Sequence, residues 1–353
     1  MIIGIYTPYR RDEVTVSALR LADLAIQLGL TVKLISPGSI ERPVHPYWDG
    51  RVKSSKVSNA IYRWANGCDS LIWFDHDLKS VSNVSLVNEH AQKVLVWMWH
   101  RFPERLKSTD LPYTHVMCPS VASLHSAIEH VFEDRDQILR VCPWSSGLEV
   151  IRRQGTIEDQ SISIYVQLDG LTMDELGAFP LIVCEEILGS YPDSRFTLDC
   201  GKSWPKSLRN KLRKMSNQFE GRLQIYYRSD LVTQQHLLTC HDWAWLPSTR
   251  TNTGVYALRA LACGTPVITP DVPPFQEYVI QDVNGLVVDC DTAFNWLDAP
   301  ITSSRLANTL NKFTQAMKLE TLSKCQKAKW QVIRVMEEDF RLAWMHLWGI
   351  ELS

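Results

Sequence analysis

Short apolar runs alternate with segments of helical periodicity through the first half of the chain. Ile2 to Tyr6 is an apolar run, and Val16 to Leu28 then places apolar residues at helical spacing until Gly29 ends the pattern. Continuous apolar runs of this length are typical of strands buried on both faces of a parallel sheet. The alternation therefore predicts βαβ units, with further strands at Thr31 to Ile35, Ser70 to Phe74, Lys93 to Trp99 and His115 to Met117.

The second half repeats this alternation after an interruption. Residues 151–160 are polar and show no periodicity, after which a strand is predicted at Ile162 to Gln167 and a helix at Glu175 to Leu188. The chain ends in a long helical region, Ser304 to Trp348. Further strands are predicted at Arg195 to Asp199, Leu223 to Tyr227 and Pro266 to Thr269. We predict two Rossmann-like α/β domains, residues 1–150 and 160–327, and a final helix from about residue 328 to 353.

Composition agrees with a folded protein of two domains. A chain of 353 residues exceeds what one hydrophobic core usually supports. Its 45% hydrophobic and 22% charged residues exclude a disordered chain. The net charge of −2 gives no overall attraction to nucleic acid, so such binding would require a local basic surface.

Cysteine usage and hydropathy favour the cytoplasm. The nine cysteines include no CxxC pair and no regular spacing with histidine, so we expect reduced, mostly buried thiols rather than disulfides or a zinc site. No apolar run is long enough to span a bilayer, and the first residues lack the pattern of a secretory signal. We therefore expect a cytoplasmic protein.

A polar loop follows the apolar run that ends at Leu246. Open parallel sheets bind ligands beyond the carboxyl ends of their strands, and this loop leads there into a short helix closed by Cys263-Gly264. Backbone N–H groups at a helix N-terminus form an anion site, and Arg250 adds a positive charge suited to a diphosphate. In the alternative interpretation, Thr251 or Asn252 only caps the helix.

The segment from Leu246 to Val288 resembles the nucleotide-sugar half of the large family of retaining group 1 glycosyltransferases (family 4). Its pattern runs P-S-x-x-E-G-F-G-x-x-x-x-E-A-x-A-C-G-x-P-V. Both acidic positions of that pattern differ here, since Thr251 and Arg259 replace the two glutamates. The matching residues are Pro247, Ser248, Gly254, Ala260, Ala262, Cys263, Gly264, Pro266, Val267, Glu277, Asn284 and Gly285.

The resemblance implies the GT-B fold, in which two Rossmann-like parallel-sheet domains face a central cleft and the C-terminal helix crosses back to the N-terminal domain. It implies transfer of a sugar from a nucleotide-sugar donor to an acceptor hydroxyl, with retention of configuration and without a metal or a cofactor. The diphosphate would be held by Arg250, Thr251, Asn252, Thr253 and Gly254.

The donor site must differ from the usual one in its charges. In the family the first glutamate holds the donor sugar and the second the ribose, whereas the guanidinium of Arg259 cannot accept a bond from a hydroxyl. It could stack on a base or hold a phosphate, or Arg259 could lie on a solvated helix face. An Arg and a Lys usual after the first strand of this domain are also absent, and Gln167 stands near the Arg position.

In the N-terminal half, Trp97-Met-Trp-His100 resembles the strand-then-histidine segment of the family, so His100 is expected to meet the donor sugar. Loops after other strands supply further polar side chains. Asp75 and Asp77 flank His76, but one histidine with two carboxylates makes a metal site improbable. These residues are either simply solvated in a loop, which is the favoured interpretation, or contact the acceptor. Possible acceptor-side residues are Arg10, Arg11, Asp75, Asp77 and Arg101.

The segment Lys202 to Lys214 carries six basic residues among thirteen and no acidic one. A solvated helix face is the usual meaning of such a run. Alternatively, Lys202, Lys206, Arg209 and Arg213 contact phosphates of nucleic acid, as in a viral type of GT-B enzyme that glycosylates hydroxylated DNA bases.

Two further alternatives remain for the function. The missing glutamates are compatible with a binding protein that kept the frame and lost turnover. The second alternative is a phosphorylase or an epimerase of the same fold. However, no motif in the sequence suggests the pyridoxal-bearing lysine of a phosphorylase.

Overall fold

The computed structural model describes residues 1–7, 13–36, 52–56, 65–74, 90–96, 113–130, 138–141, 161–168, 179–200, 206–227, 231–248, 254–290 and 303–351. The chain forms two compact units. Unit 1 comprises Met1–Gly147 together with Val335–Ser353, and unit 2 comprises Leu148–Arg334. The sequence places the corresponding boundaries at residues 150–160 and about 328.

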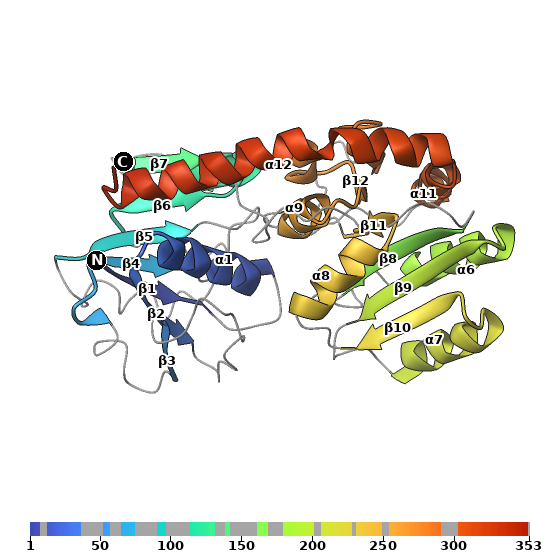
Figure 1. Cartoon of the computed structure of the whole chain (residues 1–353), viewed down its shortest axis with the longest axis horizontal. Helices are drawn as coiled ribbons and strands as arrows, with labels where there is room; N and C mark the ends of the chain where they lie inside the picture. Colours follow the sequence, from blue (N-terminus) through green and yellow to red (C-terminus); the bar gives the residue numbers. More distant parts are fainter. Residues whose placement is uncertain are drawn as a thin grey trace. The chain divides into compact units, whose positions relative to one another are not determined.

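Unit 1 is built on a parallel sheet with the strand order β3-β2-β1-β4-β5-β6-β7 (Figure 1). Helix α1 (Glu13–Gln27) contacts β1 and β2, and α4 (Val121–His130) contacts β6 and β7. The strands are β1 (Ile2–Tyr6), β2 (Thr31–Ser36), β3 (Val52–Lys56), β4 (Ser70–Trp73), β5 (Gln92–Val96), β6 (His115–Cys118) and β7 (Ile138–Val141).

The apolar runs of the sequence predict the inner strands of this sheet but not its two edge strands, β3 and β7. β1, β2, β4, β5 and β6 are confirmed, and β4 is buried throughout, as expected for an inner parallel strand. β3, with the sequence VKSSK, was not predicted because it has almost no apolar residue. It forms through main-chain pairing with β2, which includes the partners Val32 and Val52. β7 (ILRV) at the other edge was also not predicted.

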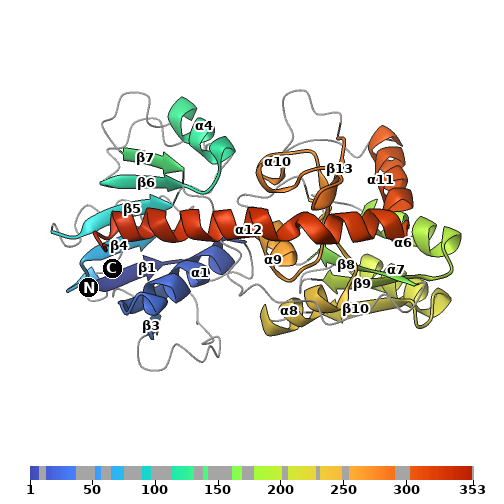
Figure 2. The ribbon, with the colours of Figure 1, turned by 45° about the horizontal axis from the view of Figure 1, so that its top comes forward.

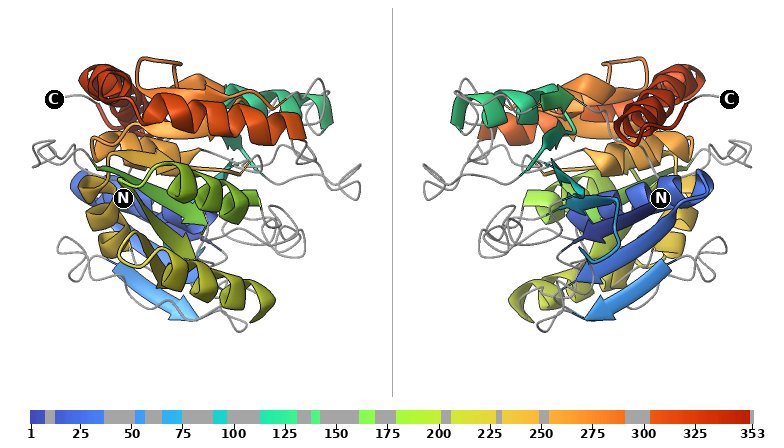
Figure 3. Two further views of the ribbon diagram at one scale, coloured as in Figure 1. Left: turned by 90° about the vertical axis from the view of Figure 1, so that its right-hand side faces the viewer. Right: turned by 90° about the vertical axis from the view of Figure 1, so that its left-hand side faces the viewer.

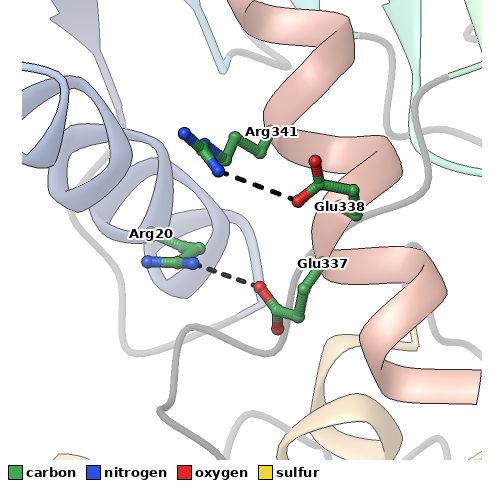
Figure 4. A network of polar contacts seen from close by, with 4 residues as sticks. All are labelled: Arg20, Glu337, Glu338 and Arg341. Atoms are coloured by element: carbon green, nitrogen blue, oxygen red, sulfur yellow. Dashed lines mark hydrogen bonds and ion pairs between the residues drawn. The ribbon is translucent and has the colours of Figure 1, made fainter. Parts of the chain in front are cut away.

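The end of the last helix belongs to unit 1. Helix α12 spans Leu319–Leu347, and its Phe340, Trp344 and Trp348 side chains, the last just beyond the helix, are buried. Arg20 of α1 forms an ion pair of 3.1 Å with Glu337, and its guanidinium lies 5.8 Å from the Phe340 ring centroid (Figure 4). The predicted return of the C-terminal helix to the N-terminal domain is confirmed.

Unit 2 is a second parallel sheet, with the order β10-β9-β8-β11-β12-β13. Figure 2 labels β10, β9, β8 and β13 of this sheet. Its strands are β8 (Ile162–Leu168), β9 (Ser194–Cys200), β10 (Leu223–Tyr227), β11 (Trp243–Trp245), β12 (Val267–Pro270) and β13 (Gly285–Val288). Its helices are α6 (Phe179–Ser190), α7 (Lys206–Gln218), α8 (Leu231–Cys240), α9 (Val255–Ala262), α10 (Phe275–Tyr278) and α11 (Ser303–Ala316).

The chain winds in two directions through this sheet. It runs outward from β8 through β9 to β10, then returns to β11 beside β8 and continues to β12 and β13. Right-handed crossovers place α6 and α7 on one face and α8 and α9 on the other, as Figure 3 (left) shows. The direction of winding therefore reverses between β8 and β11, which is where such sheets bind ligands.

The core of unit 2 is aromatic where α11 meets the sheet. Phe313 of α11 packs edge-on against Trp245 of β11, with ring centroids 5.0 Å apart. Trp245 in turn meets Phe179 of α6 at 6.0 Å, and the indole N–H of Trp243 donates to the carbonyl of Ala316 at 3.1 Å. These contacts fix β11, whose carboxyl end leads into the predicted binding loop.

Two expectations from composition can be checked on the described residues. Of the eight cysteines among them, all are free thiols and all except Cys240 are buried. In the part of the chain that the structure describes, no helix is both long enough and apolar enough to cross a membrane.

Candidate functional site

The predicted diphosphate loop starts at the reversal point of the unit 2 sheet. Leu246, Pro247 and Ser248 directly follow β11, and all three are buried. The loop ends at Gly254, which precedes α9. Because the carboxyl ends of β8 and β11 are adjacent, the start of the loop at Leu246 to Ser248 lies at the position where open parallel sheets bind nucleotides.

Gly254 has a conformation and surroundings that only glycine tolerates. Its φ is +64°, in the left-handed region. A Cβ atom here would lie 2.7 Å from Cε2 of Tyr278 and 3.2 Å from Cγ of Pro274. The Gly254 carbonyl accepts the first hydrogen bonds of α9, from the N–H groups of Ala257 (2.9 Å) and Leu258 (3.3 Å). Gly254, the N-cap residue, makes no side-chain cap hydrogen bond, and the positive end of the α9 dipole lies at this terminus.

Tyr278 is held in place by the Asn284-Gly285 segment. The Asn284 side chain donates to the Tyr278 carbonyl and accepts from the Ile280 N–H, both at 2.8 Å. A Cβ on Gly285 would lie 2.5 Å from the Val267 carbonyl oxygen. Asn284 and Gly285 therefore fix the short helix α10 against Gly254, which explains why this pair accompanies the loop in the sequence pattern.

Arg305 of α11 holds the other end of the loop. It is buried, and its Nη2 donates to the Pro247 carbonyl at 3.1 Å. Its guanidinium lies 5.2 Å from the centroid of the Phe179 ring, and burial lowers its pKa. A buried cation between a ring and a carbonyl has little freedom, so the chain enters the loop in a fixed direction.

A buried polar cluster lies behind the loop on β8 and β9. The Tyr165 hydroxyl reaches both Oε1 of Gln167 and Oδ2 of Asp199, the latter at 2.6 Å. Gln234 of α8 donates to the same Asp199 oxygen at 3.1 Å. Burial, followed by the charge of Asp199 and the hydrogen bond to it, raises the pKa of Tyr165 well above its usual value. Tyr165 is therefore a permanent donor to a buried carboxylate.

Arg259 joins this cluster from α9 and is only 3% exposed. Burial lowers the pKa of its guanidinium, while Tyr256, Cys263, Tyr165 and Asp199 act in the opposite direction. Nη1 of Arg259 has no hydrogen-bond partner among the described residues. The alternative that placed Arg259 on a solvated helix face is wrong, because the family's acidic position has become a buried cation close to an acid from β9.

The structure describes only part of the predicted site. Gly254 and Arg259 lie at the loop and in the cluster behind it. Lys206, Arg209 and Arg213 lie on α7. The following predictions fall outside the described residues: Arg10, Arg11, Asp75, Asp77, His100, Arg101, Lys202, Arg250, Thr251, Asn252 and Thr253.

Sequence reasoning missed the residues that support the loop from a distance. Asp199 is a fully buried carboxylate between Leu198 and Cys200 near the end of β9, where a carboxylate is unusual and could have been noticed. Arg305, in contrast, looks like any charged residue of an amphipathic helix. Its link to Pro247 spans 58 positions and has no local signal.

A family comparison now agrees with this geometry. Residues 201–316 match the sequence model of the family described as Glycosyl transferases group 1. The matched segment runs from before α7 to the end of α11 and includes the β11 loop and α9. Comparison with curated protein sequences gives no match.

Solved structures resemble the chain over almost its whole length. HepE from Anabaena, crystallised with UDP and glucose, has a TM-score of 0.73 at 14% identity, covering 99% of this chain and 100% of that chain. A glycosyltransferase from Rickettsia africae gives 0.70 at 13% identity, with 99% and 98% covered. Sucrose-phosphate synthase from Thermosynechococcus elongatus gives 0.67 at 14%, also with 99% and 98% covered.

Taken together, the fold is GT-B, with two parallel-sheet α/β domains, and residues 201–316, in the second of them, match the family model of group 1 glycosyltransferases.

Proposed function

We propose that the protein is a glycosyltransferase that moves a sugar from a nucleotide-sugar donor to an acceptor hydroxyl. The observation that carries the proposal is the position of the β11 loop. It lies at the reversal point of the sheet, leads into the N-terminus of α9, and falls inside the segment that matches the glycosyltransferase family.

The reaction requires stabilisation of a leaving diphosphate. The bond between the anomeric carbon and the diphosphate oxygen breaks as the acceptor oxygen bonds to that carbon, and the proton of the acceptor hydroxyl passes to the leaving diphosphate. The released negative charge would be met by the dipole of α9 and by Arg250, with Thr251, Asn252, Thr253 and Gly254 lining the loop. His100 is proposed to contact the donor sugar.

We also propose retention of configuration and independence from metal, since a helix terminus and an arginine can balance the diphosphate charge without a cation. HepE was crystallised with UDP-glucose and with UDP, which makes UDP the first nucleotide to test.

The donor site of this protein differs from the usual site of the family at Arg259, which replaces a glutamate. Tyr165 and Gln234 already hydrogen-bond Asp199, and Arg259 adds a cation nearby. The cluster is therefore suited to an anionic group rather than to ribose hydroxyls. We propose that Arg259 acts on the phosphate side of the nucleotide.

Thermal unfolding in the presence of nucleoside diphosphates tests the site. A ligand at about 100 times its Kd stabilises the folded state by about 2.7 kcal/mol, so UDP or another matching nucleotide should raise Tm clearly. Arg250→Ala should remove most of that shift. Arg195→Ala is the control, because Arg195 is exposed near the opposite, amino end of β9.

Turnover separates an enzyme from a binding protein. The pure protein should release nucleoside diphosphate from the matching sugar nucleotide, and EDTA should leave the rate unchanged. A shift in Tm without any hydrolysis or transfer would favour the inactive binding protein. An unchanged shift in Arg250→Ala would place the phosphates elsewhere.

A further inference from the structure

A basic groove runs along the outer edge of unit 2. It lies between α7 and β10, the edge strand of the sheet, and has a volume of about 710 Å³. Figure 1 shows α7 beside β10 in unit 2. It is far from the β11 loop in the strand order, because β9 and β8 lie between. The groove is lined by Lys206, Arg209, Asn210, Arg213, Ser216, Asn217, Ile225 and Tyr227.

Three of the residues that line the groove are cations, namely Lys206, Arg209 and Arg213. Among the described residues, no carboxylate lies within ion-pair distance of Lys206, Arg209 or Arg213. Lys211, on the same helix but outside the groove, pairs with Glu185 at 3.8 Å. Glu185 therefore balances Lys211, whereas Lys206, Arg209 and Arg213 lie together in the groove.

The three cations follow one side of the helix. They stand at positions i, i+3 and i+7, which share a face and span about 10 Å along the axis. Leu212 and Met215 are buried and attach α7 to the core. A single phosphate group is too small to meet all three cations, so their spacing fits a chain with repeated negative charges.

Tyr227 adds an aromatic surface at the end of β10. It is 48% exposed and lines the groove together with Ile225, two positions earlier on the same face of the strand. Arg209 lines the same groove as Tyr227, so the exposed ring lies among the cations of the groove. An exposed ring beside cations is the arrangement on which unstacked bases bind.

We propose that the α7–β10 groove binds a single strand of nucleic acid, with phosphates on Lys206, Arg209 and Arg213 and a base on Tyr227. Arginine forks bind phosphate oxygens in pairs, and the side chains of Asn210 and Asn217 offer donors and acceptors to base edges. A duplex keeps its bases stacked and would leave Tyr227 unused. An acidic peptide has no base to stack there.

Fluorescence anisotropy with a labelled mixed-sequence DNA strand of about 16 nucleotides tests this without any donor sugar. Three phosphate contacts predict that log K falls with log salt with a slope of about −2. The double variant Arg209→Ala/Arg213→Ala should bind at least about tenfold more weakly at about 0.1 M salt, with the slope reduced by about 1.4. Tyr227→Ala should weaken binding by about tenfold and Tyr227→Phe by much less.

The matched control is Lys211→Ala/Lys214→Ala, which removes the same charge from the same helix outside the groove. It should leave affinity nearly unchanged. Alanine favours the helix, so both double variants should fold, and circular dichroism checks this. The proposal is overturned if the two double variants lose DNA affinity equally. It is also overturned if hyaluronate or polyglutamate binds as tightly as the DNA strand, or if the same sequence binds more tightly as a duplex. None of these outcomes affects UDP binding, so the proposed transferase function is tested separately.

Discussion

Gly254 shows how a single backbone conformation fixes the entrance to α9. Its positive φ would cost any other residue about 1 to 2 kcal/mol. The close approach of Tyr278 adds a second, steric requirement. Gly254 therefore couples the loop after β11 to α10, and the residue is needed for shape rather than for chemistry.

Gly254→Ala should lower the free energy of unfolding of unit 2 by about 3 kcal/mol, because backbone strain and overpacking both contribute. Gly221→Ala is the matched control. Gly221 has a φ of +76°, and an added Cβ would meet nothing within 4 Å. Urea unfolding of both variants should show the larger loss for Gly254, and equal losses would show that Tyr278 moves aside without cost.

Sequence reasoning found the loop but not the environment of Arg259. Gly254, Cys263 and Gly264 mark the ends of α9 by local rules of glycine and helix termination, so they were predictable. Arg259 is buried, and the charges that act on its guanidinium include those of Tyr165 and Asp199, which come from distant strands. No local pattern carries that information, and the helix face of an arginine is ambiguous until its neighbours are known.

At the scale of elements, α12 is the helix whose role depends most on distant contacts. The sequence predicted one helical region from Ser304 to Trp348, whereas the structure contains two helices with a break at Met317 and Lys318. Both helices are amphipathic, so the apolar periodicity continues almost unchanged across the break. A continuous apolar pattern thus hides the break between the two helices. An edge strand such as β3 is missed because it lacks an apolar run.

Glu337→Gln should destabilise unit 1 by about 1 kcal/mol, because it removes the charge that Arg20 meets at 3.1 Å in a partly buried position. Glu338→Gln, one residue further on, should have almost no effect. Glu338 pairs with Arg341 at 3.8 Å, and both side chains are about half exposed (Figure 4). Chemical denaturation measures the difference, and a larger loss for Glu338→Gln would contradict this assignment.

At the scale of the whole molecule, buried thiols in both units link stability to alkaline pH. Burial raises the pKa of Cys118 to about 12, of Cys263 to about 12 and of Cys325 to about 11, from a usual value of 9.0. Below pH 9.0 these thiols are protonated in both the folded and the unfolded chain. Above it the unfolded chain releases protons that the folded chain retains, so the free energy of unfolding falls with pH.

We expect this fall to extend from about pH 9 towards pH 12, with each thiol contributing up to about 1.4 kcal/mol per pH unit. Cys263→Ala should make the fall shallower by up to one such contribution. Urea midpoints measured at several alkaline pH values test this, and an identical slope in Cys263→Ala would refute it.

The two-domain architecture was the most predictable feature of the molecule. Alternating strands and helices require parallel sheets, and their apolar runs identify the inner strands. The reversal of winding between β8 and β11 was not readable from the pattern, because strand order depends on which strands pair, not on their sequence positions.

The membership of Val335–Ser353 in unit 1 has a consequence for the order in which the protein matures. A ribosome delivers β1 to β7 first, but Phe340 and Trp344, which complete their core, emerge only after all of unit 2. Unit 2 is contiguous in sequence and can close its own core as soon as it has left the exit tunnel. The half of the molecule that is made first is therefore finished last, and a nascent chain halted before residue 335 leaves that half with an uncovered apolar surface for chaperones to bind.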